Sequence, residues 1–185
     1  MQDNITAFLA APDQAGLIAA QNAWKTARKA YQQSEVFRFA NPVVDDWEGK
    51  LNSWPLDEGL IDYVAGDYFY ALGNIGGELN IIANTSLNIG SDVIDATKID
   101  AELLRSLHEL GGSAAHVTTG YHAIEFLLWG QDLNGHKLGA GERPYTDYIS
   151  GDGCTNQHCD RRADYLRVVS GHPKLPITTA QNYWQ

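Results

Sequence analysis

A histidine and a glutamate lie three residues apart within an otherwise apolar stretch, as His122 and Glu125 of the run Gly120–Gly130. Residues at this spacing share one face of an α-helix. A neutral imidazole and an ionised carboxylate are ligands for first-row transition metals, and they also form an acid/base pair. The order His-x-x-Glu differs from the His-Glu-x-x-His of zinc proteases, which supplies two imidazoles and a separate base. A hydrogen-bonded His–Glu pair inside a core, with no further role, is the structural alternative.

The helix that carries this pair has two faces to bury. At about 100° per residue, Phe126 and Trp129 share the side of His122 and Glu125, while aliphatic side chains lie on the other side. The aliphatic side is expected to pack into a helical core. The side with the pair is expected to face a second packed layer or a lined cleft, because aromatic rings flank the charges.

Several motifs of the chain, in order, resemble the imelysin family. Gly120-x-His122-x-x-Glu125 is similar to its Gly-x-His-x-x-Glu signature. Other imelysin segments resemble the runs 23–39, 45–50, 54–63 and 154–166. Imelysins are extracytoplasmic bacterial proteins linked to iron acquisition, originally described as insulin-cleaving peptidases. The resemblance implies a metal-binding protein of iron uptake. It makes the cofactor a divalent or ferric ion, with iron favoured and zinc as the alternative.

The resemblance also implies a fold and a partner. Imelysins have two helical halves with the site near their interface, and 185 residues supply little more than the amino-terminal half. We therefore expect one all-α domain over 1–185, a bundle of about four main helices with long loops and a divergent tail at 171–185. The chain is then either a fragment or a minimal form. In both cases a second imelysin half or another subunit is expected at the His122 face.

Further ligands are sought on the long helix predicted for 15–39. Its inward stripe is apolar at Trp24 and polar at Glu35 and Arg38, so these charges need partners. We expect Glu35 or Arg38 within direct or one-water reach of the His–Glu pair, with Glu35 as an oxygen ligand and Arg38 keeping a carboxylate ionised. A structural ion pair of Glu35 with Arg38 or Arg28 is the alternative.

Asp57 and Gly120 complete the predicted site. Asp57 is the fourth candidate ligand, although capping of a short helix at 56–64 explains it as well. Gly120 is predicted to lie inside a helix that begins after Ser113. A glycine there indicates close approach of a bound group or another backbone, or tight helix packing.

Three function classes remain open. The leading one is metal binding by His122, Glu125, Glu35 and Asp57. The second is a metallopeptidase in which Glu125 is the general base or a zinc ligand, but the nearby His116 falls on about the opposite side of the helix. The third is a non-catalytic helical interaction module whose aromatic and charged face docks a partner.

Composition limits the kinds of partner and the cellular compartment that are expected. A net charge of −10 and a pI near 4.8, with scattered basic residues, argue against nucleic-acid binding. Cys154 and Cys159 favour a local disulfide over a metal site with His158, because a lone close pair fits an oxidising compartment. The first residues lack the positive region of a secretory signal. We therefore expect a periplasmic or cell-surface protein, whose missing leader or lipid anchor leaves peripheral membrane association open.

The remaining pattern predicts mostly helices and loops. We expect a loop at 41–56, helix over much of 68–89, a helix at 101–110 capped by Asp100, a long loop at 131–160 and a last helix at 160–170. No strand alternation is evident.

Overall fold

The computed structural model describes residues 1–38, 41–70 and 73–171. Within these residues the chain is mostly helical, as predicted, with a single two-stranded hairpin. The predicted tail at 171–185 lies outside the described residues except for Gly171. No described helix is both long enough and apolar enough to cross a membrane. The helices are α1 (Gln2–Ala10), α2 (Gln14–Ser34), α3 (Pro42–Asn52), α4 (Glu58–Ile61), α5 (Ala101–Leu107), α6 (Tyr121–Trp129) and α7 (Cys159–Gly171).

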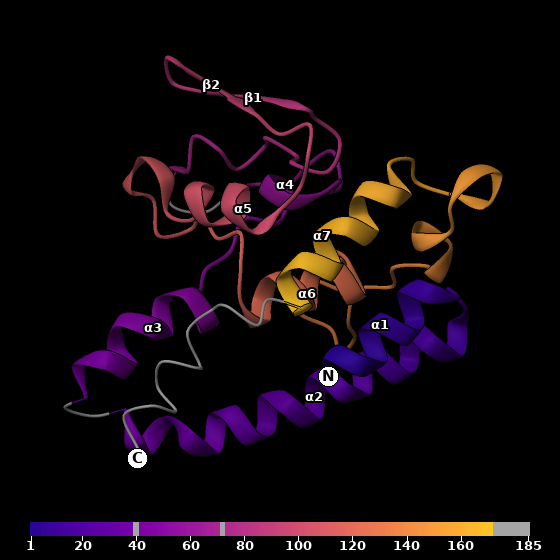
Figure 1. The fold of residues 1–185 in the computed structure, drawn as a ribbon, viewed down its shortest axis with the longest axis horizontal. Coiled ribbons are helices and arrows are strands. Elements are labelled where there is room, and N and C mark those ends of the chain that lie inside the picture. The colour runs from indigo at the N-terminus through magenta and orange to yellow at the C-terminus, as the bar shows by residue number, and fades with distance from the viewer. Residues whose placement is uncertain (39–40, 71–72, 172–185) are drawn as a thin grey trace.

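The first two helices form an antiparallel pair, with α1 folded back along the first part of α2 (Figure 1). Asp13 caps α2 by accepting a hydrogen bond from the Gly16 backbone N–H at 2.6 Å. The apolar stripe predicted for α2 is buried at Leu17, Ala20 and Trp24. Beyond Trp24 no residue of α2 is fully buried, so this helix reaches past the core it helps to close.

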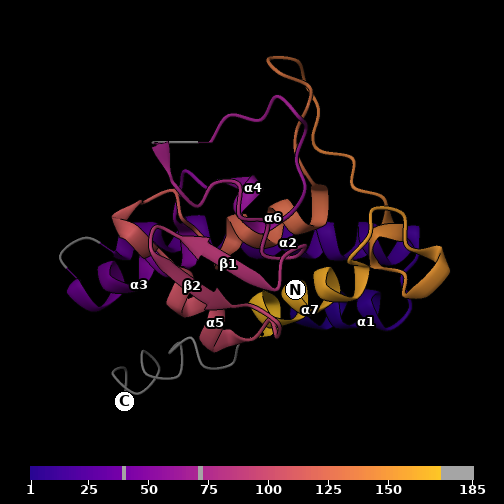
Figure 2. The ribbon, with the colours of Figure 1, turned by 90° about the horizontal axis from the view of Figure 1, so that it is seen from above.

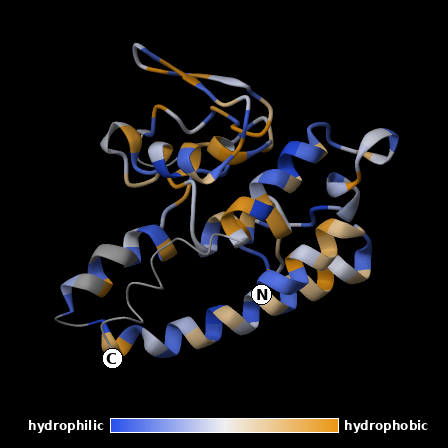
Figure 3. Cartoon of the chain, viewed as in Figure 1, coloured by the Kyte–Doolittle hydropathy of each residue, from blue (hydrophilic) through white to orange (hydrophobic). Residues whose placement is uncertain are grey.

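The signature helix α6 lies at the centre of the fold. It contacts α2, α3, α4 and α7, and Figure 3 shows it as one of the most apolar helices. Ala123, Leu127 and Leu128 are fully buried. The core therefore holds α6 from several sides, which fixes the positions of the polar residues it carries.

The helix predicted over much of 68–89 was wrong: the described residues 68–70 and 73–89 form no α-helix, and turns there lead into a hairpin that begins at Ser86. Strand β1 (Ser86–Ile89) pairs antiparallel with β2 (Asp92–Asp95), with Ser86 opposite Asp95. Leu87 and Ile89 point inward while their neighbours are exposed, which is a period of two. Gly90 begins the turn at φ +61°, a conformation that suits glycine. The prediction of no strands was wrong, because a strand of four residues contains only two repeats of this alternation.

Arg161 of α7 fastens this hairpin to the core. Its guanidinium donates to the carbonyls of Ile82 at 2.7 Å and of Ala96 at 2.8 Å. It reaches three more carbonyls on the same two segments, those of Ile81, Asn84 and Thr97. One side chain therefore satisfies carbonyls on both sides of the hairpin.

Replacing Arg161 by Ala is expected to lower the free energy of unfolding by about 2–4 kcal/mol, because several carbonyls lose a charged donor together. Urea unfolding monitored by circular dichroism measures this change. Arg167→Ala on the same helix is the control, since its pair with Asp164 is exposed and is expected to contribute less than about 1 kcal/mol. Equal effects of the two substitutions would refute the role given to Arg161.

Candidate functional site

Gly120 positions the signature helix, but not from inside it. It is the residue before α6 and has a φ of +91°. A Cβ at this position would lie 2.6 Å from the Leu51 carbonyl oxygen and 2.9 Å from that of Lys50. The prediction of a helix from Ser113 was therefore wrong, because the chain turns at Gly120 where the end of α3 approaches. Close approach of another backbone, one of the predicted reasons for the glycine, is confirmed.

His122 and Glu125 form a direct pair on α6. The His122 Nδ1 atom lies 2.9 Å from the Glu125 Oε2 atom, and the two side chains are 15% and 42% exposed. The Trp54 ring packs against the imidazole with 4.8 Å between ring centres. The imidazole is thus held on two sides, by a carboxylate and by an indole, while part of the carboxylate stays accessible.

The pair opens on a cleft of about 830 Å³. Helix α2 supplies Trp24, Lys25 and Arg28, while α4 supplies Glu58. The segment after α6 supplies Asp132 and the stretch 139–141. Figure 2 shows this segment rising above α6, and Gln131 Oε1 ties it to the Ala65 backbone N–H at 2.7 Å. The predicted lined cleft is therefore present on the aromatic side of α6.

An aromatic wall stiffens the cleft. Trp24 donates its indole N–H to the Tyr121 carbonyl at 2.9 Å and meets the Trp129 ring edge-to-face at 5.4 Å. The Lys25 Nζ atom lies 5.5 Å from the centre of the Trp129 ring. Because these rings are locked by hydrogen bonding and edge packing, the wall is pre-formed.

Glu58 is a cleft residue that the sequence did not single out. Burial raises the pKa of Glu58 to about 7, against the opposing effect of Arg143. The charges of Asp132 and Glu125 raise this pKa further, so the three carboxylates influence one another. Glu58 directly follows Asp57, the residue that the sequence predicts as a ligand, in the first turn of α4.

Asp57 is used elsewhere. Its side chain is fully buried, where it accepts hydrogen bonds from Asn74 Nδ2 at 2.8 Å and from the Tyr68 hydroxyl at 3.2 Å. It is the residue before α4, but its carboxylate makes no capping hydrogen bond there. Asp57 therefore supports the core beneath the cleft and does not line it.

Neither Glu35 nor Arg38 lines the cleft that His122 lines. Helix α2 ends at Ser34, and Glu35–Phe37 form a 3₁₀ turn. Arg38 pairs with Glu48 of α3 at 2.9 Å and with Asp45 at 3.6 Å. Among the described residues no three His, Cys, Asp or Glu side chains are grouped to hold a metal ion. The predicted four-ligand set is thus not assembled there, and metal binding by His122 and Glu125 stays a prediction.

His116 lies in the buried cluster around Asp57. Its Nδ1 atom lies 3.1 Å from Asn74 Oδ1, and the side chain is fully buried. Burial lowers the pKa of His116 to about 4, although Asp57 acts in the opposite direction and His108 reinforces the shift. This histidine is therefore neutral in the native protein over the physiological range.

The pH dependence of stability follows from this cluster. An unfolded histidine has a pKa near 6.5, so between about pH 6.5 and 4 the unfolded chain binds a proton that native His116 does not. The free energy of unfolding therefore carries no penalty from His116 above about pH 6.5. As the pH decreases across this window, it falls by up to about 3 kcal/mol. Urea titrations across this window should show a steeper loss for the wild type than for His116→Asn. Equal slopes would contradict this assignment.

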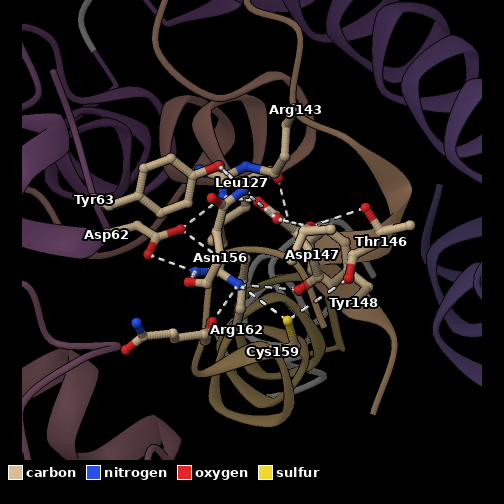
Figure 4. Close-up of polar contacts among 12 residues, drawn as sticks. Asp62, Tyr63, Leu127, Arg143, Thr146, Asp147, Tyr148, Asn156, Cys159 and Arg162 are labelled. Carbon is tan, nitrogen blue, oxygen red and sulfur yellow. Dashed lines mark hydrogen bonds and ion pairs between the residues drawn. The ribbon is translucent and has the colours of Figure 1, made fainter. Parts of the chain in front are cut away.

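A second buried cluster surrounds Arg162 of α7, next to Cys159 (Figure 4). Cys154 and Cys159 are joined, which confirms the predicted disulfide. The turn that the disulfide closes presents the Gln157 carbonyl to Arg162 at 3.0 Å. Arg162 also pairs with Asp62 at 2.6 Å, and Arg143 with the same carboxylate at 2.7 Å. The disulfide therefore holds one wall of a buried ion-pair network that reaches Asp147.

Comparisons with known proteins agree with the resemblance noted for the signature. The Imelysin family model, a peptidase M75 family, matches residues 1–185. A curated relative named Iron-regulated protein A, from Synechococcus elongatus, is 33% identical over 61 residues. That match covers 32% of this chain and 17% of the relative, so the chain aligns with a small part of it. Because the family model matches residues 1–185 of this chain, the chain belongs to the imelysin family.

Proposed function

We propose that this chain binds a transition metal ion, iron in preference to zinc, through His122 and Glu125, and serves iron uptake outside the cytoplasm. The observation that carries the proposal is the 2.9 Å pair of Nδ1 and Oε2 facing the cleft. Membership of the imelysin family and a relative named for iron regulation support the choice of metal. The Cys154–Cys159 disulfide supports an oxidising compartment such as the periplasm or cell surface.

The pair has the chemistry and spacing of two ligands on one metal. His122 Nδ1 and Glu125 Oε2 lie 2.9 Å apart, at hydrogen-bonding distance, so a nitrogen ligand and an oxygen ligand would be available side by side. The ion would supply Lewis acidity and charge, whereas the protein orients one nitrogen and one carboxylate. A proton at Nδ1 has to leave for the nitrogen to become a ligand, so affinity is expected to fall as pH decreases.

Two ligands leave most coordination positions to other groups. We propose that a second imelysin half or another subunit covers the His122 face and adds ligands. Glu58 and Asp132 border the same cleft and offer further oxygens. The exposed Trp54 ring, 70% accessible, extends the apolar rim on which such a partner would rest.

Peptide hydrolysis has weaker support. Glu125 could act as a base, but it is engaged by His122. His116, the nearby imidazole in sequence, is buried with Asn74 and is not a cleft residue. The family's peptidase name is therefore not matched by a second histidine beside the pair within the described residues.

Calorimetric titration tests the proposal. Chelator-treated protein would be titrated with Fe²⁺ under anaerobic conditions, with Zn²⁺, and with Mg²⁺ as the control ion. We expect saturable 1:1 binding of Fe²⁺ and Zn²⁺ and none of Mg²⁺, because imidazole favours the transition metals. Absence of binding by all three ions would refute the proposal, as would equal binding of Mg²⁺.

A further inference from the structure

The cleft is much larger than a metal ion requires. Its volume of about 830 Å³ falls in the range of pockets that hold small organic molecules, about 300–1,000 Å³. A hydrated metal ion would fill a small part of it, since one water takes about 30 Å³. The walls include the rings of Trp24, Trp54 and Trp129. Volume and aromatic lining both point to an organic occupant.

One wall of the cleft is cationic. Lys25 and Arg28 project from neighbouring turns of α2 and both line the cleft. The Arg28 guanidinium lies 5.4 Å from the ring centres of Tyr31 and Tyr121. Because Lys25 and Arg28 are both cationic donors that line the cleft, this wall is suited to receive anionic oxygens.

The acidic groups come from other elements. Glu58 belongs to α4, Glu125 to α6 and Asp132 to the segment after α6, and their charges act on one another. A bare cation would be attracted to these carboxylates but repelled by Lys25 and Arg28. A metal that carries its own anionic ligand suits both sides, because its ion meets the imidazole and carboxylates while its anionic groups meet α2.

We propose that the cleft takes the metal as a complex with a small polycarboxylate chelator. In this arrangement His122 and Glu125 hold the ion, and the chelator supplies further oxygen ligands to it. Arg28 and Lys25 receive the chelator's carboxylates, and the tryptophan rings enclose its carbon skeleton. The proposal rests on metal binding by the His122–Glu125 pair and adds the chemical class of the co-ligand.

The test compares the complex with each of its components. The full chain would be titrated by calorimetry with Ga³⁺–citrate, a redox-inert stand-in for a ferric complex, with citrate alone and with Zn²⁺ alone. We expect Ga³⁺–citrate to bind at 1:1 stoichiometry and at least tenfold more tightly than citrate. His122→Ala should remove this advantage.

Substitutions on α2 separate the chelator from the metal. Arg28→Gln and Lys25→Gln should each weaken Ga³⁺–citrate binding by about tenfold or more, because each removes a charged donor, and should leave Zn²⁺ affinity within about twofold. Lys29→Gln is the matched control, since Lys29 is exposed and is not a cleft residue. Lys25 is exposed, so its variant keeps the test usable if Arg28→Gln unfolds.

The outcomes distinguish the two proposals. Zn²⁺ binding without Ga³⁺–citrate binding overturns the chelate proposal and leaves the metal site standing. Citrate binding as tightly as the complex, or an effect of Lys29→Gln equal to that of Lys25→Gln, also overturns the chelate proposal. Failure of both Zn²⁺ and Ga³⁺–citrate to bind refutes the metal site itself.

Discussion

Arg162→Met is expected to lower the free energy of unfolding by about 3–5 kcal/mol at neutral pH, because it removes one partner from a buried ion pair. Arg162 is 1% exposed and meets both oxygens of Asp62, at 2.6 and 3.0 Å. It also donates to the Asp147 carbonyl at 3.0 Å. Methionine fills similar space but leaves these acceptors without that donor.

The rest of the network limits the size of this loss. Arg143 keeps its contact with Asp62 at 2.7 Å, so the carboxylate is not left without a cation. Asp147 retains the Tyr63 hydroxyl at 2.6 Å and Asn156 at 2.6 Å. Urea unfolding measures the effect, with the exposed Arg167→Met as the control. A loss below about 1 kcal/mol for Arg162→Met would contradict the structural role of the network.

His122→Ala is expected to weaken Fe²⁺ or Zn²⁺ binding by at least about 100-fold. It removes the single nitrogen ligand that the pair offers. Loss of a residue that only hydrogen-bonds to a metal ligand already lowers metal affinity by about 10–100-fold. Glu125→Gln should have a smaller effect, of about tenfold or more, because its amide oxygen is a weaker ligand for a cation. Calorimetric titration with each ion gives the affinities.

His136→Ala is the matched control for this comparison. His136 is exposed in the loop after α6 and is not a cleft residue. Its substitution should leave metal affinity within about twofold. If His136→Ala weakened binding as much as His122→Ala, the ion would be bound at the surface and not by the signature pair.

The features that the sequence predicts correctly are those that depend on residues close together in the chain. The Asp100 cap of α5 is present, with its carboxylate accepting from Glu102 and Leu103 backbone N–H groups at 3.0 Å. The joined cysteines and the start of the final helix are also as expected. Each of these features depends on residues within a few positions of one another, where spacing alone fixes the contact.

Glu35 and Arg38 do not line the cleft, because the helix whose period placed them there ends before Glu35. The stripe that starts at Trp24 holds only while the helix continues, and α2 ends before Glu35. A 3₁₀ turn has about 3.0 residues per turn, so Arg38 leaves the predicted direction. Its partners lie on α3, which was expected to be a loop. Pro42 begins α3, since proline suits the first turn of a helix.

Glu58 and Gly120 show a second limit. Choosing between Asp57 and Glu58 requires knowing which side of a four-residue helix faces the cleft, and so short an element has too few residues to show a period. Gly120 keeps the helix from starting earlier, and the reason for a glycine there is the nearby Leu51 carbonyl, which is distant in sequence. Both decisions depend on tertiary contacts that no local pattern contains.

The position of the bound metal tests the central claim most directly. Crystals of the protein grown with saturating Fe²⁺ or Zn²⁺ would be measured at the absorption edge of that metal, where anomalous scattering locates the ion. We predict a peak within ligand distance of both the His122 imidazole and the Glu125 carboxylate, on the cleft side of α6. A peak bound only elsewhere, or no peak at saturating metal, would contradict the claim that this pair is a metal site.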